Sequence, residues 1–269
     1  MSDKKEMISA AQLQFEASHH RHHRTVTVLR LFLLVAFLAV WELCADLKII
    51  DSFFFSSPSR VAVCLITLWQ KNDLAVHIGI TLAETIASFL LVFLISMICA
   101  TALWYSTKLS EVLEPYLVVL NSLPKSALAP LLIVWLGTGM NTIIVAGISV
   151  AVFGAIINLY TGFQQVDEEK IKLIYTLGGS RRDTLFKVVL PSCIPTILST
   201  MKVNIGLALV GVIIGEFLAA RRGLGYLIIY GSQVFQLNMV ITSILILCVI
   251  AMVLYQIIQM LEHSYKKRV

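Results

Sequence analysis

TLGGSRRDTLFKVVLP, at residues 176–191, is a polar segment in an otherwise apolar chain. Gly178 and Gly179 can end one helix, because glycine readily adopts the left-handed conformation that follows a helix C-terminus. Ser180 and Asp183 have the spacing of a capping box, which begins a helix. The segment therefore predicts two short helices joined at the paired glycines.

The first of these helices is expected over residues 167–177, DEEKIKLIYTL. Its first turn holds three acidic residues, whose charge suits the positive end of the helix dipole: Asp167, Glu168 and Glu169. Its apolar residues are spaced to lie roughly on one side: Ile171, Ile174 and Leu177. The second helix carries four apolar residues to the end of the segment: Leu185, Phe186, Val188 and Val189. We call residues 167–190 the elbow. It either docks into a groove of another protein or rests on the membrane as an amphipathic connector, and the residues alone leave both readings open.

The composition on either side of the elbow is that of a membrane protein. The chain has 269 residues, 58% hydrophobic and 14% charged, with a mean hydropathy of +0.86. Soluble domains are only about 45–50% apolar. Six windows reach the roughly 20 apolar residues that a helix needs to cross a bilayer: about 26–45, 78–105, 116–136, 142–160, 195–218 and 240–261. Their residues do not alternate as β-barrel strands do. We therefore predict an all-α integral membrane protein with six transmembrane helices.

The distribution of Lys and Arg predicts the orientation, because cytoplasmic loops are enriched in both. With the N-terminus inside, the cytoplasmic flanks hold fourteen of them: Lys4, Lys5, Arg21, Arg24, Arg30, Lys108, Lys170, Lys172, Arg181, Arg182, Lys187, Lys266, Lys267 and Arg268. The outer flanks hold five: Lys48, Arg60, Lys71, Arg221 and Arg222. Both termini and the loop at residues 162–191 are thus expected in the cytoplasm. The net charge of +5 reflects this asymmetry and gives no reason to expect a nucleic-acid partner.

Residues 1–25 are predicted to be a cytoplasmic basic tail, and residues 26–269 the transmembrane domain. The tail contains HHRHH, from His19 to His23. This cluster favours contact with anionic lipid headgroups over metal binding, although histidine clusters do bind metals. The first span is too long and begins too far along the chain for a cleaved signal peptide. The five cysteines are scattered singly and have no metal-site spacing, so they are interpreted as small apolar packing residues.

Polar residues within the spans mark candidate sites, because each needs a partner or water. The third span contains NSLPKSALAPLL, and we expect Pro124 and Pro130 to break its backbone hydrogen bonding. Lys125 lies beside this break, where it faces a pathway, extends its ammonium to the membrane surface, or pairs within the bundle. The other polar groups in or at the ends of spans are Glu84, Asn121, Asn158, Lys202, Asn204 and Glu216.

The outer loop at residues 219–236 carries Arg221 and Arg222 before two glycines that permit a tight turn. These two cations either dock acidic groups of a binding protein, draw an anionic solute inward, or are simply solvated.

The spacing of Gly178, nine further residues and Val188-x-Leu190-Pro191 resembles the loop with the EAA signature in permease subunits of ABC importers. At the position of Glu-Ala-Ala this chain has Lys172, Leu173 and Ile174. SSPSRV at residues 56–61, NSLPKSALAPLLIVWLGTG at 121–139 and GEFLAARRGLGYLI at 215–228 resemble the nitrate, sulfonate and taurine branch of these permeases. That branch also includes importers of pyrimidine-type vitamin precursors.

The resemblance implies a type I ABC importer permease fold whose cytoplasmic loop couples to an ATPase. It implies a homodimer of permeases, two ATPase subunits, and an extracellular or periplasmic solute-binding protein, all at the plasma membrane of a prokaryote. The residues implied in ATPase coupling are Asp167, Glu168, Lys172, Ile174, Leu177, Gly178, Gly179, Ser180, Arg181, Arg182, Asp183, Leu190 and Pro191. With the third to fifth spans lining the passage, the pathway candidates are Asn121, Lys125, Asn158, Lys202, Asn204 and Glu216. The candidates for binding-protein docking are Arg221 and Arg222.

The chain has no GxxxxGK[ST] phosphate-binding motif, so ATP and its magnesium are expected to bind a partner subunit. We expect no catalytic, cofactor or metal site in this chain. An intramembrane enzyme is disfavoured because Glu84 and Glu216 are far apart in the sequence and no HExxH motif occurs. The remaining alternative is an ATP-independent secondary transporter or channel, although no repeat between the halves is apparent. A sulfonate, taurine, nitrate or a heterocyclic precursor all remain open as the solute.

Overall fold

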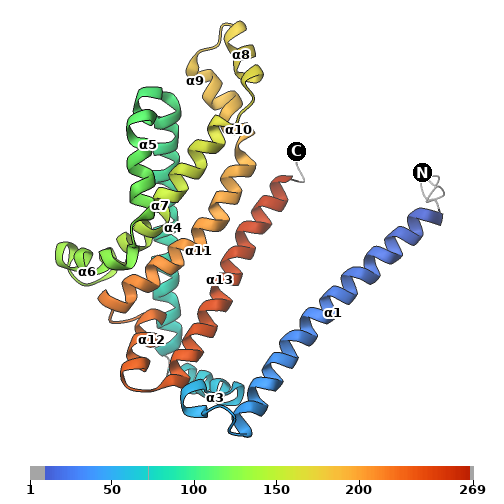
Figure 1. Ribbon diagram of the computed structural model, residues 1–269, viewed down its shortest axis with the longest axis vertical. Helices are drawn as coiled ribbons and strands as arrows, with labels where there is room; N and C mark the ends of the chain where they lie inside the picture. Colours follow the sequence, from blue (N-terminus) through green and yellow to red (C-terminus); the bar gives the residue numbers. More distant parts are fainter. Residues whose placement is uncertain (1–9, 72, 267–269) are drawn as a thin grey trace. The chain divides into compact units, whose positions relative to one another are not determined.

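The computed structural model describes residues 10–71 and 73–266, and its regular elements within these ranges are all helices (Figure 1). They are α1 (Ala10–Asp46), α2 (Ser52–Phe55), α3 (Pro58–Gln70), α4 (Asp73–Tyr105), α5 (Thr107–Ser122), α6 (Lys125–Leu136), α7 (Met140–Gln164), α8 (Glu168–Thr176), α9 (Arg181–Thr184), a π-helical turn (Leu185–Val189), α10 (Leu190–Ser192), α11 (Ile194–Ala219), α12 (Leu224–Gln233) and α13 (Leu237–Lys266). The predicted all-α class is confirmed.

Five of these helices contain stretches long and apolar enough to cross a membrane: Val28–Asp46, Asp73–Tyr105, Met140–Gln164, Ile194–Ala219 and Leu237–Ser264. The pair formed by α5 and α6 makes a sixth if it is counted as one span. Five of the six predicted spans are therefore present as single helices within the described residues, and the remaining one, the third, corresponds to the bent pair.

The third predicted span is not one straight helix. Its two halves, α5 and α6, are bent by 96° at the break between them. Leu123 at this break has an extended backbone, with φ −63° and ψ 139°, as expected for a residue before proline. The predicted break at Pro124 is confirmed. Pro130 has no N–H to donate, so the hydrogen bond is missing there as predicted, but the helix is not interrupted, because α6 continues to Leu136.

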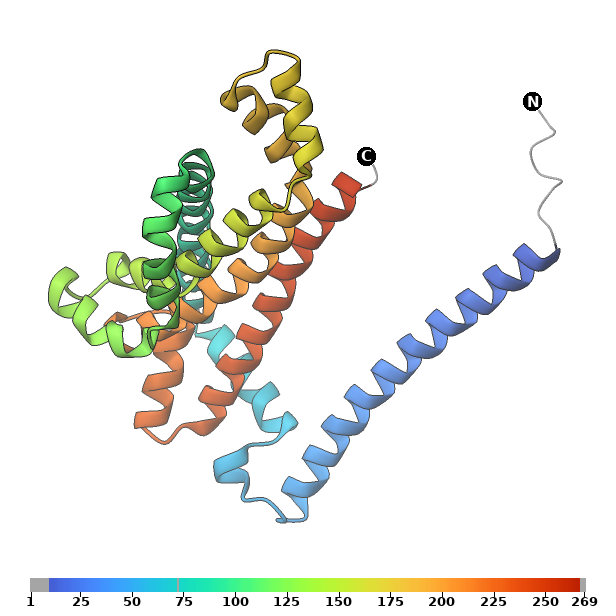
Figure 2. The ribbon, with the colours of Figure 1, turned by 45° about the horizontal axis from the view of Figure 1, so that its top comes forward.

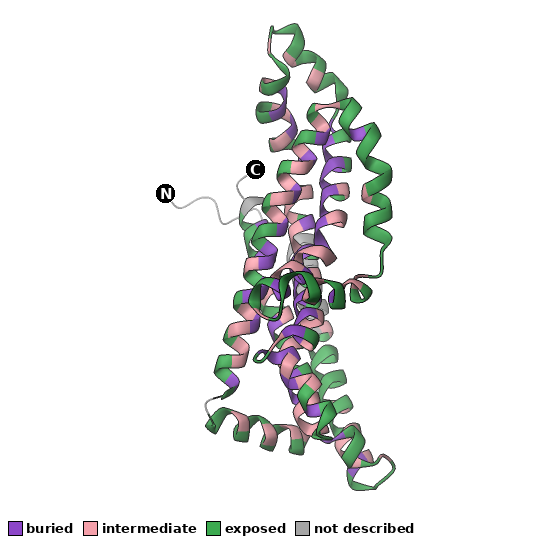
Figure 3. Ribbon diagram, turned by 90° about the vertical axis from the view of Figure 1, so that its left-hand side faces the viewer, coloured by how far each residue is buried: buried purple, intermediate pink, exposed green. Residues whose placement is uncertain are grey.

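The centre of the bundle is formed by α4, α7 and α11, which lie side by side in both views (Figures 1 and 2). Gly147 and Gly211 allow a close approach: a Cβ added to Gly211 would lie 2.7 Å from the Cα of Gly147. Small residues serve membrane helices in this way, because tight packing has to replace the hydrophobic effect. Buried residues accordingly run along these inner helices, whereas α6 is mostly exposed (Figure 3).

One core cluster links this bundle to the elbow. It joins buried residues of α4 and α7, such as Val92 and Leu159, to Leu185 and Val189 in the elbow and to Cys193 just after it. The Sγ of Cys193 also donates a hydrogen bond to the carbonyl oxygen of Gly162 at the end of α7, at 3.3 Å. The elbow is thus packed onto the bundle core and is not a loose connector.

The described residues divide into two compact units, one ending at Val63 and the other beginning at Cys64. Helix α1 of the first unit includes residues 10–25 of the predicted tail, so this part continues the first span as a helix. The side chains of His19 to His23 lie outside the described residues. The elbow and all pathway candidates belong to the second unit.

Candidate functional site

The first helix of the elbow begins as its charge pattern predicts. Asp167 is its N-cap, and its carboxylate accepts a hydrogen bond from the backbone N–H of Glu169 at 2.9 Å. The sequence predicts Asp167 in the first turn with Glu168 and Glu169. In the structure Asp167 is instead the cap that precedes this turn. Lys172 and Glu168 form an exposed ion pair one turn apart, at 3.1 Å. Such an exposed pair stabilises a helix by only about 0.3–0.5 kcal/mol.

The apolar residues of α8 face two directions. Ile171 and Ile174 are partly buried against the rest of the chain, as predicted. Leu177 does not share their side, because its side chain is 75% exposed, and Leu173 is 57% exposed. The prediction that Leu177 shares a side with Ile171 and Ile174 is wrong, since the helix ends at Thr176 and the chain then turns at the glycines. Leu173 and Leu177 leave two large apolar side chains on the outer surface of the elbow.

The turn at the glycines has the geometry of a Schellman motif. The N–H of Gly179 donates to the carbonyl of Ile174 at 2.9 Å, and the N–H of Gly178 donates to that of Tyr175 at 3.0 Å. Gly178 has φ +79°, which a residue with a Cβ adopts only at a cost. At Gly179 an added Cβ would lie 2.5 Å from Cγ2 of Ile174. The predicted helix end is confirmed, and the backbone favours glycine at both positions.

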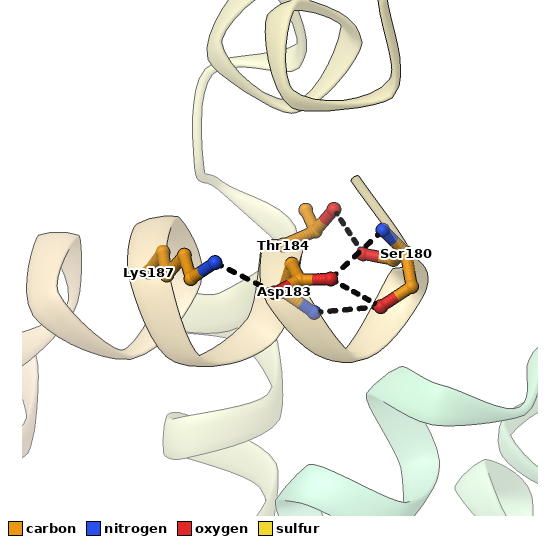
Figure 4. Close-up of polar contacts among 4 residues, drawn as sticks. All are labelled: Ser180, Asp183, Thr184 and Lys187. Carbon is orange, nitrogen blue, oxygen red and sulfur yellow. Dashed lines mark hydrogen bonds and ion pairs between the residues drawn. The ribbon is translucent and has the colours of Figure 1, made fainter. Parts of the chain in front are cut away.

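The capping box at Ser180 and Asp183 is confirmed (Figure 4). The Oγ of Ser180 accepts from the N–H of Asp183 at 3.2 Å, and the carboxylate of Asp183 accepts from the N–H of Ser180 at 3.0 Å. Lys187 pairs with the same carboxylate at 2.7 Å. Its hydrogen bond, together with those from Ser180, holds the pKa of Asp183 well below the ordinary aspartate range. Asp183 therefore stays ionised at neutral pH, and its capping box with Ser180 fixes the residue at which the second helix of the elbow begins.

A π-helical turn over Leu185–Val189 interrupts this second helix. The N–H of Leu190 donates to the carbonyl of Leu185, five residues back, rather than four. The wide turn immediately precedes Pro191, which has no N–H to give and whose ring clashes with the carbonyl four residues back in a regular helix. Turns of this type occur often at functional sites. The prediction of one regular helix from Ser180 to Leu190 is therefore correct for its start, but the π-helical turn interrupts it.

The two arginines of the elbow lie near the end of α4. The Nη2 of Arg181 donates to the carbonyl of Trp104 at 3.0 Å, and its guanidinium lies over the rings of Trp104 and Tyr105 at 5.6 and 5.5 Å. The guanidinium of Arg182 lies 5.9 Å from the ring centre of Phe186. Both side chains thus lie against aromatic rings of the chain itself.

Three of the pathway candidates gather around the bend between α5 and α6. The Nζ of Lys125 donates to the carbonyl of Leu120 and lies 5.1 Å from the ring centre of Phe153 on α7. The amide of Asn121 lies against Gly154 on α7, where an added Cβ would be 3.3 Å from its Oδ1. Asn158 is exposed one turn further along α7, on the face that carries Gly154.

Lys202 lies elsewhere and pairs within the bundle. It forms an ion pair with Glu262 of α13, and its side chain is only 17% exposed. Its Nζ also lies 5.9 Å from the ring centre of Tyr255. Asn204, two residues further along α11, is buried. The structure therefore does not bring these two residues together with Lys125.

Glu216 joins three helices through buried hydrogen bonds. The hydroxyl of Thr81 on α4 donates to its carboxylate at 2.6 Å, and the N–H of Gly225 at the start of α12 donates at 2.5 Å. Glu84 of α4 is buried beside this carboxyl. Gly223 has φ +121°, and an added Cβ would lie 2.5 Å from the same carboxylate. In this arrangement Glu216 fixes the N-terminus of α12.

Sequence reasoning missed Thr81 and His77 as partners at this end of the bundle. The N–H of Gly223 donates to Nδ1 of His77 at 2.8 Å. The available signal was the polar face of α4, but its partners are 135 or more residues away in the chain. Arg221 and Arg222 are exposed beside this network, and their role in docking stays a prediction. Helix α12 lies at the end of the bundle opposite α8 (Figure 1).

The comparisons with known proteins all identify the same family. The family model described as "Binding-protein-dependent transport system inner membrane component" matches residues 92–267. A "Probable ABC transporter permease protein" of Haemophilus influenzae is 33% identical over 232 residues, which are 85% of this chain and 92% of that protein. The "Formylaminopyrimidine transport permease protein ThiX" of Halalkalibacterium halodurans is 25% identical over 70% of this chain and 75% of its own length. The "Taurine transport system permease protein TauC" of Escherichia coli is 26% identical over 82% of each chain.

Among solved structures, a chain of the MetNI methionine ABC transporter in an inward-facing conformation has the same fold. The TM-score is 0.64 at 18% identity, over 71% of this chain and 95% of that chain. The arrangement of the membrane helices is therefore that of an ABC importer permease.

Proposed function

Because the chain belongs to the family of binding-protein-dependent permeases of ABC importers, we propose that its elbow is the part through which a separate ATPase drives import of a small solute. One observation carries the proposal. The elbow has a fixed shape, is packed into the bundle core through Leu185 and Val189, and exposes Leu173 and Leu177 on its outer side. Exposed apolar groups on a rigid polar element suit a protein partner better than water.

The partners follow from this role. ATP and magnesium bind to two cytoplasmic ATPase subunits, and a second copy of this chain completes the passage. A binding protein outside the cell, or in the periplasm, delivers the solute next to Arg221 and Arg222. The assembly lies in the plasma membrane of a prokaryote, with both termini of this chain in the cytoplasm. The asymmetry of Lys and Arg supports this orientation.

In this mechanism the elbow moves as one piece when the ATPase subunits close. Its inner end contacts α4 and α7 in a single core cluster, and α10 leads directly into α11. A displacement of the elbow therefore reaches three packed helices together, and the bundle rocks between inward and outward access.

The solute is an anionic or heterocyclic small molecule, in the range from taurine, other sulfonates and nitrate to pyrimidine precursors. Two relatives are named for taurine and formylaminopyrimidine transport. Lys125, Asn121 and Asn158 on one side of α7 supply a cation and two amides to such a solute.

Copurification tests the coupling role. We expect the double substitution Leu173→Asp with Leu177→Asp to release the ATPase subunit from the detergent-solubilised complex, while the chain still inserts in the membrane. Leu109→Asp, at an exposed leucine in the first turn of α5, serves as the matched control and should retain the ATPase. An ATPase subunit that stays bound to the double variant would refute the proposed contact. A wild-type chain that never copurifies with an ATPase would favour an ATP-independent carrier.

A further inference from the structure

A groove of about 690 Å³ lies between the end of α4 and the second half of the elbow. Its walls are largely apolar and include Ile98, Ala102, Phe186 and Leu190, while Arg182 stands among them as the cation. Ile98 is 61% exposed and Phe186 is 57% exposed, so the apolar wall is open along much of its surface. We call this the Arg182 groove.

The Arg182 groove lies at the level where a membrane-spanning helix meets water. Helix α4 ends at Tyr105, and the last two residues, Trp104 and Tyr105, are aromatic. Trp and Tyr are enriched at the boundary between the hydrocarbon core and the headgroups. A phosphate at the height of Arg182 would thus lie in the headgroup layer.

An apolar stripe continues from the Arg182 groove into the membrane. Leu90, Leu94 and Ile98 are exposed at four-residue intervals on α4, and Ala102 of the groove continues the series. Residues at this interval share one helix face. From Leu90 to Ala102 the stripe is about 18 Å long at 1.5 Å per residue. One leaflet contributes about 15 Å of a hydrocarbon core that is roughly 30 Å thick, so the stripe is long enough to contact an acyl chain over the whole depth of that leaflet.

The charge at the groove is not neutralised by the chain. Within residues 10–71 and 73–266, no ion pair joins Arg181 or Arg182 to a carboxylate. The nearest acid in the sequence, Asp183, is engaged by Ser180 and Lys187. An arginine against an apolar wall favours a phosphate, which its planar guanidinium binds with two parallel hydrogen bonds.

From these features we propose that the Arg182 groove binds an anionic phospholipid of the cytoplasmic leaflet. Its phosphate lies on the guanidinium of Arg182, and one acyl chain runs along Ile98, Leu94 and Leu90. The lipid touches both α4 and the elbow, so it holds these two elements together at the membrane surface. The inference goes beyond the transport function and does not depend on the identity of the solute or the ATPase.

Native mass spectrometry of the full chain, purified in a neutral detergent, tests the proposal. The chain is titrated separately with phosphatidylglycerol and phosphatidylcholine of the same acyl composition, and the fraction that retains one lipid is measured. We expect phosphatidylglycerol to bind at least about fivefold more tightly, since one cation near the membrane surface contributes about that factor. Arg182→Gln should abolish this preference. The matched control Lys172→Gln, which removes one cation from an exposed position on α8, should retain it.

Ala102→Trp provides a second test, because it fills the groove and leaves both arginines in place. We expect it to weaken phosphatidylglycerol binding as strongly as Arg182→Gln does, and it decides the matter if Arg182→Gln does not yield folded protein. Equal binding of the two lipids to the wild-type chain would overturn the proposal. It would also be overturned if inorganic phosphate displaced phosphatidylglycerol at equal concentration, because the site would then bind soluble anions.

Discussion

Replacing Gly178 by proline is the sharpest test of the elbow as a transmitter of force. Gly178 has φ +79°, whereas proline is locked near −65°, so the helix end cannot keep its shape. Proline also removes the hydrogen bond from the N–H of residue 178 to Tyr175. The left-handed conformation alone costs a residue with a Cβ about 1–2 kcal/mol. The lost hydrogen bond adds about 0.5–1.5 kcal/mol.

Together these costs come to about 1.5–3.5 kcal/mol, which shifts the equilibrium from the native elbow toward a rearranged one by a factor of about 10–400. The assay is ATP hydrolysis by the complete transporter in liposomes, with and without solute-loaded binding protein. We expect Gly178→Pro to abolish the stimulation by the binding protein and to leave the basal rate measurable. Gly178→Asn is the control, because asparagine tolerates the left-handed region, and it should retain most of the stimulation. Normal stimulation in Gly178→Pro would show that the elbow does not couple the two parts.

Three further outcomes follow from the charged groups. Glu216→Ala should destabilise the chain by about 1–3 kcal/mol, because it leaves the buried hydroxyl of Thr81 and the N–H of Gly225 without their acceptor, and detergent-solubilised thermal unfolding measures it. A Tm equal to wild type would contradict this. Lys202→Ala should lower the Tm more than Lys202→Met combined with Glu262→Leu, since the single change leaves a buried carboxylate without its lysine; the reverse order would refute the reasoning. The lowered pKa of Asp183 makes its capping contribution complete above the ordinary aspartate pKa and lost only as pH falls through the lowered value. The hydrogen-exchange rates of the elbow amides, corrected for intrinsic rates, should therefore be the same at about pH 6 and about pH 8. Asp183→Asn should increase these rates at both pH values. Corrected rates that differ between the two pH values in the wild type would contradict this.

Features that depend on neighbours in the sequence were predicted well. The end of α8 at Gly178 and the restart at Ser180 are set by backbone freedom and capping, which act within a few residues. The break at Pro124 is similarly local, because proline restricts the residue before it. The 96° angle at that break could not be predicted, since it depends on how α6 packs against α7 and α11.

The partners of buried charges were also beyond the sequence. Lys202, Lys125 and Glu216 all met the same criterion, a polar group within an apolar span. In the structure Lys202 pairs with Glu262, Lys125 lies by Phe153, and Glu216 holds α12. These differences arise from contacts between distant segments, so one sequence criterion could not separate the three environments.

The internal hydrogen bonds of the elbow explain why it suits mechanical coupling. The Schellman motif and the capping box satisfy the backbone groups on both sides of the turn without help from a partner. A partner that binds Leu173 and Leu177 would therefore meet a surface that is already ordered, and little conformational entropy would be lost on binding. At the other end, Val189 and Cys193 are buried in the bundle core, and Cys193 is tied to the last turn of α7. An element that is rigid in itself and fixed to two spanning helices can transmit a displacement of a few ångströms, whereas a flexible connector of the same length would absorb it.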